Sequence, residues 1–210
     1  LIGRNLLHAS FFDELPFAEG EFDLVIGNPP WTYAGANQHK PSARLPSIAQ
    51  PRRSPDWAFL WRARELAKPD ARLALLMKAT PLFSKDRVAS EARRLLLTTF
   101  YDVRIINLSQ LRSEGLFPAL ASNGELKVRA NTAPALLFSG RPGVRDKNST
   151  VEVANVAWNP NFRRNGIITL TADDLHAAPL SAVVSDPVLF KAAVFGKDRE
   201  YQVMEGRQLR

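Results

Sequence analysis

Short apolar runs alternate with helical patterns along the first two thirds of the chain. Four runs that are continuous and rich in Val, Ile, Leu and Phe predict buried strands: residues 22–27, 72–78, 103–108 and 133–139. Two stretches between them, residues 56–68 and 84–99, carry apolar residues near helical spacing. Strands separated by helices of this length predict an α/β fold whose mostly parallel sheet is covered on both faces.

The ends of the two helices are marked by capping residues. We expect Asp56 to cap the first helix, which should stop before Pro69, and Ser84 to begin the second. Trp57 and Trp61 lie one helical turn apart, so we expect both rings to pack against the sheet.

The organisation changes towards the C-terminal end. No helical pattern separates residues 103–108 from residues 133–139, so these two strands should pair antiparallel at one edge of the sheet. Residues 151–158 and 166–171 predict a β-hairpin. We therefore predict a boundary after residue 147, followed by a small β-rich segment.

Composition excludes several classes of protein. The 210 residues include no cysteine, which rules out disulfide scaffolds, thiol nucleophiles and Cys-ligated metals. The three histidines are scattered, so no metal site is expected. No apolar run approaches the ~20 residues that span a bilayer, and no export signal opens the chain, so we expect a cytoplasmic protein without membrane contact.

The positive charge is concentrated after residue 31. The net charge is +7; residues 1–31 carry one base and five acids, or −4, which leaves +11 for the rest. Residues 32–55 form a proline-rich loop without a single acid, and its basic residues are Lys40, Arg44, Arg52 and Arg53. We expect these side chains to contact phosphate, although the same charges would suit a solvated loop.

The motif that carries chemistry is Asn28-Pro29-Pro30-Trp31, directly after the first strand. Ligands of open α/β sheets bind outside the carboxyl ends of the strands. Two prolines make a stiff corner, where the Asn28 side-chain oxygen and a carbonyl of Pro29 can accept hydrogen bonds together. Such a corner suits a planar NH2 group, and Trp31 could stack on the attached base. A merely rigid turn is the alternative.

This geometry favours methylation of an exocyclic amine. Two acceptors would push the nitrogen of a flipped adenine towards tetrahedral geometry, so that its lone pair faces an electrophilic methyl group. The same acceptors would also suit RNA bases or a glutamine amide.

The motif resembles that of the S-adenosylmethionine-dependent N6-adenine DNA methyltransferases, particularly those of type II restriction-modification systems. The resemblance covers residues 5–140 and includes KATPLF at residues 78–83. It implies that Phe117, in Leu-Phe-Pro, forms a second wall for the adenine. Phe11 matches a cofactor-binding aromatic residue, whereas Ser10 stands where the family has Asp.

The resemblance implies a fold, a cofactor and partners. Residues 1–147 should form the C-terminal half of a Rossmann-like class I methyltransferase domain, and residues 148–210 a linker and the start of a target-recognition region. The expected partners are double-stranded DNA and an endonuclease domain or subunit. The family's glycine-rich cofactor loop has no counterpart, because no two of the 11 glycines lie within two positions of each other. We therefore expect the isolated chain to be inactive; a non-catalytic DNA-binding remnant is the alternative.

Overall fold

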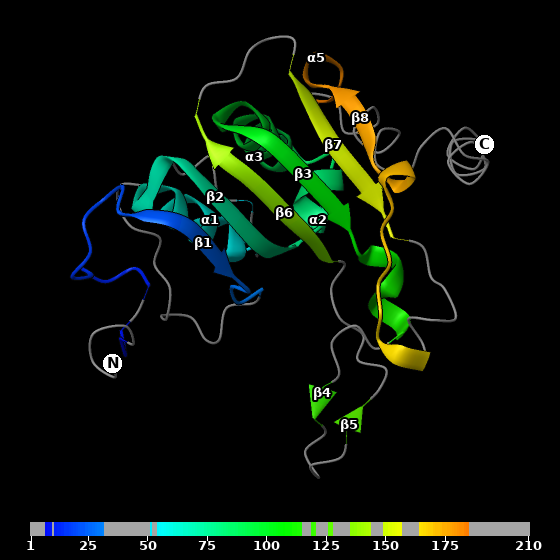
Figure 1. The fold of residues 1–210 in the computed structure, drawn as a ribbon, viewed down its shortest axis with the longest axis horizontal. Coiled ribbons are helices and arrows are strands. Elements are labelled where there is room, and N and C mark those ends of the chain that lie inside the picture. The colour runs from blue at the N-terminus through cyan, green and yellow to red at the C-terminus, as the bar shows by residue number, and fades with distance from the viewer. Residues whose placement is uncertain are drawn as a thin grey trace.

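The computed structural model of the chain describes residues 7–9, 11–31, 51, 54–114, 119–120, 126–127, 135–143, 149–156 and 164–184. Its centre is a six-stranded sheet in the order β1-β2-β6-β3-β7-β8 (Figure 1). The strands are β1 (Phe22–Gly27), β2 (Ala67–Lys78), β3 (Phe100–Asn107), β6 (Ala135–Pro142), β7 (Thr150–Asn155) and β8 (His176–Pro179).

Short helices and one small hairpin complete the described elements. The helices are α1 (Asp56–Leu66), α2 (Thr80–Phe83), α3 (Arg87–Thr99) and α5 (Leu180–Val183), with 3-10 turns η2 (Ser109–Glu114) and η3 (Ala172–Asp174). Strands β4 (Ala119–Leu120) and β5 (Leu126–Lys127) pair with each other outside the main sheet.

The predicted α/β class is confirmed, and the sheet is mixed. Strand β1 pairs with β2 in parallel, as does β3 with β7. Strand β6 is antiparallel to both β2 and β3. The antiparallel pairing of β3 and β6 is therefore as predicted, but β6 lies inside the sheet and not at its edge. The chain can enter this inner position because the segment between β3 and β6 is long enough to reverse direction.

The main core lies between the helices and one face of the sheet, where α1, α2 and α3 are found (Figure 1). Trp57 is fully buried and Trp61 nearly so, which confirms the predicted packing of both rings on the sheet. In β2, alternate residues such as Leu73 and Leu75 point into this core, as the period of a strand requires.

The opposite face is covered near one end by a smaller cluster. Leu108, Leu111 and Val156 are buried there, and Trp31 packs against them. We expected helices on both faces of the sheet, but in the described part α1, α2, α3 and α5 all contribute to the same side. The second face is covered instead by loop residues and by η2.

Strand β1 is not buried as predicted. Leu24 is 55% exposed and Ile26 69% exposed. The physical reason is its position, since β1 is the edge strand and among the described strands pairs with β2 alone. A continuous apolar run cannot by itself distinguish a central strand from an edge strand.

The predicted hairpin after residue 150 is also wrong in its second strand. Strand β7 pairs antiparallel with β8, whereas residues 166–171 form no strand. Ile168 and Leu170 pack instead against the smaller apolar cluster. Because β7 pairs with β3, the sheet continues across the boundary predicted at residue 147.

Both helix starts differ from the prediction. Pro55 occupies the N-cap of α1, so Asp56 is the first helical residue and not the cap. Helix α3 begins at Arg87, and the Asp86 carboxylate accepts hydrogen bonds from the backbone N–H groups of Val88 and Ala89. An aspartate cap satisfies N–H groups that have no partner inside the helix.

Candidate functional site

The carboxyl ends of four strands meet at one edge of the sheet. Strands β1, β2, β3 and β7 run in the same direction, because β6 is antiparallel to both of its neighbours. Asn28 follows β1 at this edge, Lys78 ends β2 and Asn107 ends β3. Open α/β sheets bind ligands outside this edge, so the structure places the predicted catalytic motif where a substrate would bind.

The four motif residues differ in burial. Asn28 and Pro30 are exposed, Pro29 is buried and Trp31 is half-buried. A buried proline with fixed φ anchors the corner, while the exposed Asn28 side chain is accessible to a substrate. The corner can therefore present hydrogen-bond acceptors without moving.

The Trp31 ring is held by the sheet. Its indole N–H donates a hydrogen bond to the Leu76 carbonyl of β2 at 3.1 Å. The ring also packs against the cluster that includes Leu108 and Val156. A partly buried indole N–H normally finds such a partner, and here the bond ties the corner after β1 to the end of β2.

A buried carboxylate lies beside this edge and was not predicted. Asp56 is fully buried, and its Oδ2 accepts a hydrogen bond from the Lys78 backbone N–H at 2.8 Å. Among the described residues, its Oδ1 has no hydrogen-bond partner. Burial raises the pKa of Asp56 from 3.8 to about 6, because desolvation outweighs the hydrogen bond from Lys78. In the sequence, an aspartate after a proline predicts a helix cap, which concealed this role.

A buried arginine holds the segment that follows β2. The Arg93 guanidinium donates from Nη1 to the Leu82 carbonyl at 3.1 Å and to the Ser84 carbonyl at 3.3 Å. The sequence carries a sign of this, because Arg93 lies four residues from both Ala89 and Leu97 on the buried stripe of α3. A charged residue on an apolar stripe indicates a partner inside the protein.

A buried network of polar side chains lies where β3 ends and η2 begins. The Asn107 amide donates to Asn155 Oδ1 at 2.8 Å, and its own oxygen accepts from the Ser109 N–H at 3.1 Å and hydroxyl at 2.6 Å. These bonds fix the start of η2, which ends three residues before Phe117. Phe117 itself lies outside the described residues.

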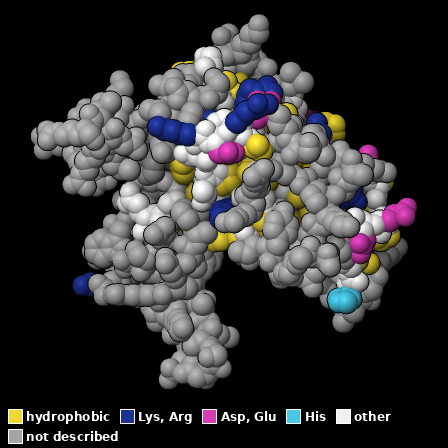
Figure 2. Space-filling view, turned by 180° about the vertical axis from the view of Figure 1, so that it is seen from behind, with side chains coloured by type: hydrophobic (Ala, Val, Ile, Leu, Met, Phe, Trp, Pro, Cys, Tyr) yellow, Lys and Arg dark blue, Asp and Glu magenta, His cyan; other side chains and the backbone are white. Residues whose placement is uncertain are grey.

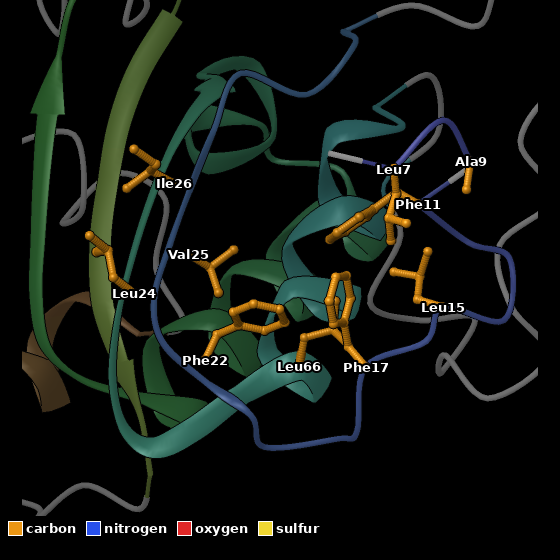
Figure 3. A pocket seen from close by; sticks show the side chains of 10 residues that line it. All are labelled: Leu7, Ala9, Phe11, Leu15, Phe17, Phe22, Leu24, Val25, Ile26 and Leu66. Carbon is orange, nitrogen blue, oxygen red and sulfur yellow. The ribbon is translucent and has the colours of Figure 1, made fainter. Parts of the chain in front are cut away.

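Of the predicted cofactor residues, only Phe11 is described. Its ring stacks on Phe59 of α1, with centroids 5.4 Å apart and planes 4° from parallel, and its carbonyl accepts from Arg62 Nε at 3.4 Å. Phe11 also lines an apolar groove of about 380 Å³ along β1, together with Phe22 and Val25 (Figure 3). The remaining predicted residues, Ser10, Lys40, Arg44, Arg52 and Arg53, lie outside the described part of the chain.

The described surface carries mixed charge. On the face seen in Figure 2, Lys and Arg side chains lie close to Asp and Glu side chains. Two ion pairs lie within α1 and α3: the largely buried pair of Arg62 with Glu65, and the more accessible pair of Arg94 with Glu91. A solvent-accessible pair such as Arg94–Glu91 contributes little to stability.

Across the described ranges, no group of three or more His, Asp and Glu side chains is arranged to hold a metal ion. None of the helices described is long and apolar enough to cross a membrane.

Comparison with solved structures shows what the fold of the chain is similar to. The chain is similar in fold to a type I restriction-modification system methyltransferase subunit from Streptococcus thermophilus, with a TM-score of 0.50 and 17% identity over 84% of this chain and 38% of that one. It also matches the type IIG restriction endonuclease BpuSI, with a TM-score of 0.46 and 16% identity over 81% of this chain and 21% of that one. The chain thus spans well under half the length of either protein.

Sequence comparison identifies the family. No curated protein has a sequence that matches. A family model matches residues 4–114, which is more than half of the chain and includes the Asn28–Trp31 corner as well as Asp56 and Arg93. The chain belongs to the Eco57I restriction-modification methylase family.

Proposed function

We propose that the chain carries the catalytic corner of an adenine-specific DNA methyltransferase of a restriction-modification system. The observation that supports this most directly is the corner itself: an exposed Asn28 and a buried Pro29 at the carboxyl end of a parallel strand, with the Trp31 ring held beside them. The family match supports methyl transfer within a restriction-modification system.

The reaction is a direct transfer to nitrogen. The Asn28 side-chain oxygen and the Pro29 carbonyl accept the two hydrogens of the N6 amine, so that its lone pair points at the incoming methyl group. The new C–N bond forms as the sulfonium C–S bond breaks, and the methylated nitrogen then loses one proton to solvent. The extruded adenine stacks on Trp31, and Phe117 forms the opposite wall.

S-adenosylmethionine supplies the electrophilic methyl group when bound. The groove beside Phe11 suits only part of this cofactor, since all ten of its lining residues are apolar. A flat adenine ring fits such a surface beside Phe11. The family resemblance assigns Ser10, its neighbour in the sequence, to the same part of the cofactor. The polar ribose and methionine parts need donors and acceptors other than these apolar side chains.

Double-stranded DNA is the proposed substrate. The phosphates of the DNA would be bound by the basic residues of the loop after Trp31, namely Lys40, Arg44, Arg52 and Arg53. An endonuclease domain or subunit would complete the restriction-modification system.

The test is methylation by the natural polypeptide that carries this chain. Duplex DNA incubated with labelled S-adenosylmethionine should gain N6-methyladenine, detected by mass spectrometry of nucleosides. Asn28→Ala should lower the rate about 100-fold or more, because one of two acceptors is lost. Asn165→Ala, at an exposed position elsewhere, is the matched control and should behave as wild type.

Other outcomes would change the assignment. Undiminished adenine methylation by Asn28→Ala would refute the role of the corner. Preferential methylation of RNA or of a protein glutamine in a competition assay would replace DNA as the substrate. Binding of DNA without any methyl transfer would favour a non-catalytic remnant.

A further inference from the structure

We propose that Asp56 and Arg93 are positioning residues for the methyl transfer. Together they fix the backbone of residues 78–84, the segment that follows β2, against the Asn28–Trp31 corner. This inference rests on the proposed function, and it adds two residues to which neither the motif nor the family resemblance gives a role.

The first contact is at the end of β2. The Asp56 carboxylate accepts the Lys78 backbone N–H at 2.8 Å, although the two residues are 22 positions apart in the chain. Asp56 is the first residue of α1, directly after the basic loop. The bond therefore fixes the end of that loop and the end of β2 relative to each other.

The second contact is at the other end of the segment. Arg93 Nη1 lies 3.1 Å from the Leu82 carbonyl and 3.3 Å from the Ser84 carbonyl, so one guanidinium holds the last turn of α2 and the residue after it. A guanidinium has a rigid planar fork of donors, which fixes direction as well as distance.

The segment and the catalytic corner are linked by Trp31. Its indole N–H donates to the Leu76 carbonyl, two residues before Lys78. Strands β1 and β2 pair in parallel as far as Gly27 and Leu75, so the corner and the segment leave the sheet side by side. A displacement of residues 78–84 would thus be transmitted to the acceptors and to the stacking ring.

Stability alone does not account for these two charges. Burying an ion costs several kcal/mol, and well-packed apolar residues are often equal or better for stability. Both side chains are fully buried, and three of their hydrogen bonds run to backbone atoms of a single segment, while Arg93 Nη2 also donates to the Ser90 hydroxyl of its own helix at 3.4 Å. The common consequence of the three backbone bonds is the fixed geometry of residues 78–84.

The experiment compares four variants of the natural polypeptide. Asp56→Ala and Arg93→Met remove the contacts, while Asp56→Asn keeps an acceptor and Arg93→Lys keeps a donor. We expect the first two to lower kcat about 10- to 100-fold with KM for S-adenosylmethionine unchanged within about twofold, since small displacements of reacting groups have effects of this size. The conservative variants should recover most of kcat.

Two controls separate positioning from a general loss of stability. Arg94→Met removes the neighbouring arginine, which pairs only with solvent-accessible Glu91 in the described contacts. Phe100→Leu weakens the core at the start of β3, at the opposite end of the sheet from the corner. Neither should alter kcat, even where Phe100→Leu lowers the melting temperature as much as Arg93→Met does.

Amide hydrogen exchange gives a readout that does not require activity. Exchange in peptides covering residues 78–84 should accelerate in Asp56→Ala and Arg93→Met, and exchange in β7 should not. If Arg93→Met does not fold, Arg93→Lys and Asp56→Ala decide the outcome. If Asp56→Ala and Arg93→Met keep the kcat of the wild type, or if hydrogen exchange in residues 78–84 is unchanged in them, the positioning role is overturned. A wild-type protein that does not methylate adenine would refute the proposed function instead, and the exchange data would still test the contacts.

Discussion

Replacing Asp56 by asparagine should change how the stability of the protein depends on pH. The carboxyl is fully buried, and burial raises its pKa from 3.8 to about 6. The folded state therefore binds the proton more tightly than the unfolded state does. The stabilisation from this proton is fully present below pH 3.8 and is lost as the pH rises through about 6.

The size of this effect on the free energy of unfolding follows from the shift in the pKa of Asp56. At about 1.4 kcal/mol per pKa unit, the whole titration corresponds to about 3 kcal/mol, of which about 2 kcal/mol falls between pH 4.5 and 7.5. Asparagine cannot ionise, so this part of the pH dependence should disappear in Asp56→Asn. The substitution also changes stability at every pH, because its amide adds donors beside an oxygen that has no partner in the described structure.

Urea unfolding of both proteins at several pH values between 4.5 and 7.5 measures the effect. The useful quantity is the difference in the free energy of unfolding between wild type and Asp56→Asn, followed against pH. Exposed carboxylates such as Glu91 and Asp174, whose pKa values are lowered by hydrogen bonds from Arg94 and Thr171, titrate alike in both proteins and cancel. The wild type should lose about 2 kcal/mol relative to the variant as the pH rises over this range. A constant difference, or one of opposite sign, would refute the argument.

Two further predictions concern the corner and the cofactor. Trp31→Phe keeps a ring but removes the donor to the Leu76 carbonyl, so urea unfolding should show a loss of about 0.5–1.5 kcal/mol; unchanged stability would mean that this bond does not hold the corner. Calorimetry of the 210-residue chain with S-adenosylmethionine should show no measurable binding, because the sequence has no glycine-rich turn of the required spacing. Tight binding would show that other residues hold the cofactor.

Some features were predictable because they depend on local sequence. The strand before Asn28, the helix that carries Trp57 and Trp61, and the break at two prolines all follow from hydrophobic period and turn chemistry. The Asn-Pro-Pro-Trp motif contains its acceptors and its ring within four consecutive residues. Its likeness to the methyltransferases could therefore be recognised without knowledge of the fold.

Other features depend on neighbours that are distant in the sequence. The exposure of Leu24 and Ile26 is set by the position of β1 at the sheet edge, and an apolar run looks the same at an edge as in the centre. The inner position of β6 depends on where a long connection returns. Strand β7 pairs with β8, whereas Ile168 and Leu170 of the segment between them pack against the smaller apolar cluster.

The sequence by itself predicted the Asn28–Trp31 corner, which we propose is catalytic, and the kind of chemistry it favours. Only the tertiary structure showed which buried side chains contact the segment beside that corner. Asp56 was predicted to cap a helix, yet its carboxylate accepts a hydrogen bond from the backbone N–H of Lys78. The Arg93 guanidinium donates hydrogen bonds to the carbonyls of Leu82 and Ser84, which precede its own helix. The physical reason is that a side chain's hydrogen-bond partner is set by the packing of separate elements, which no local pattern specifies.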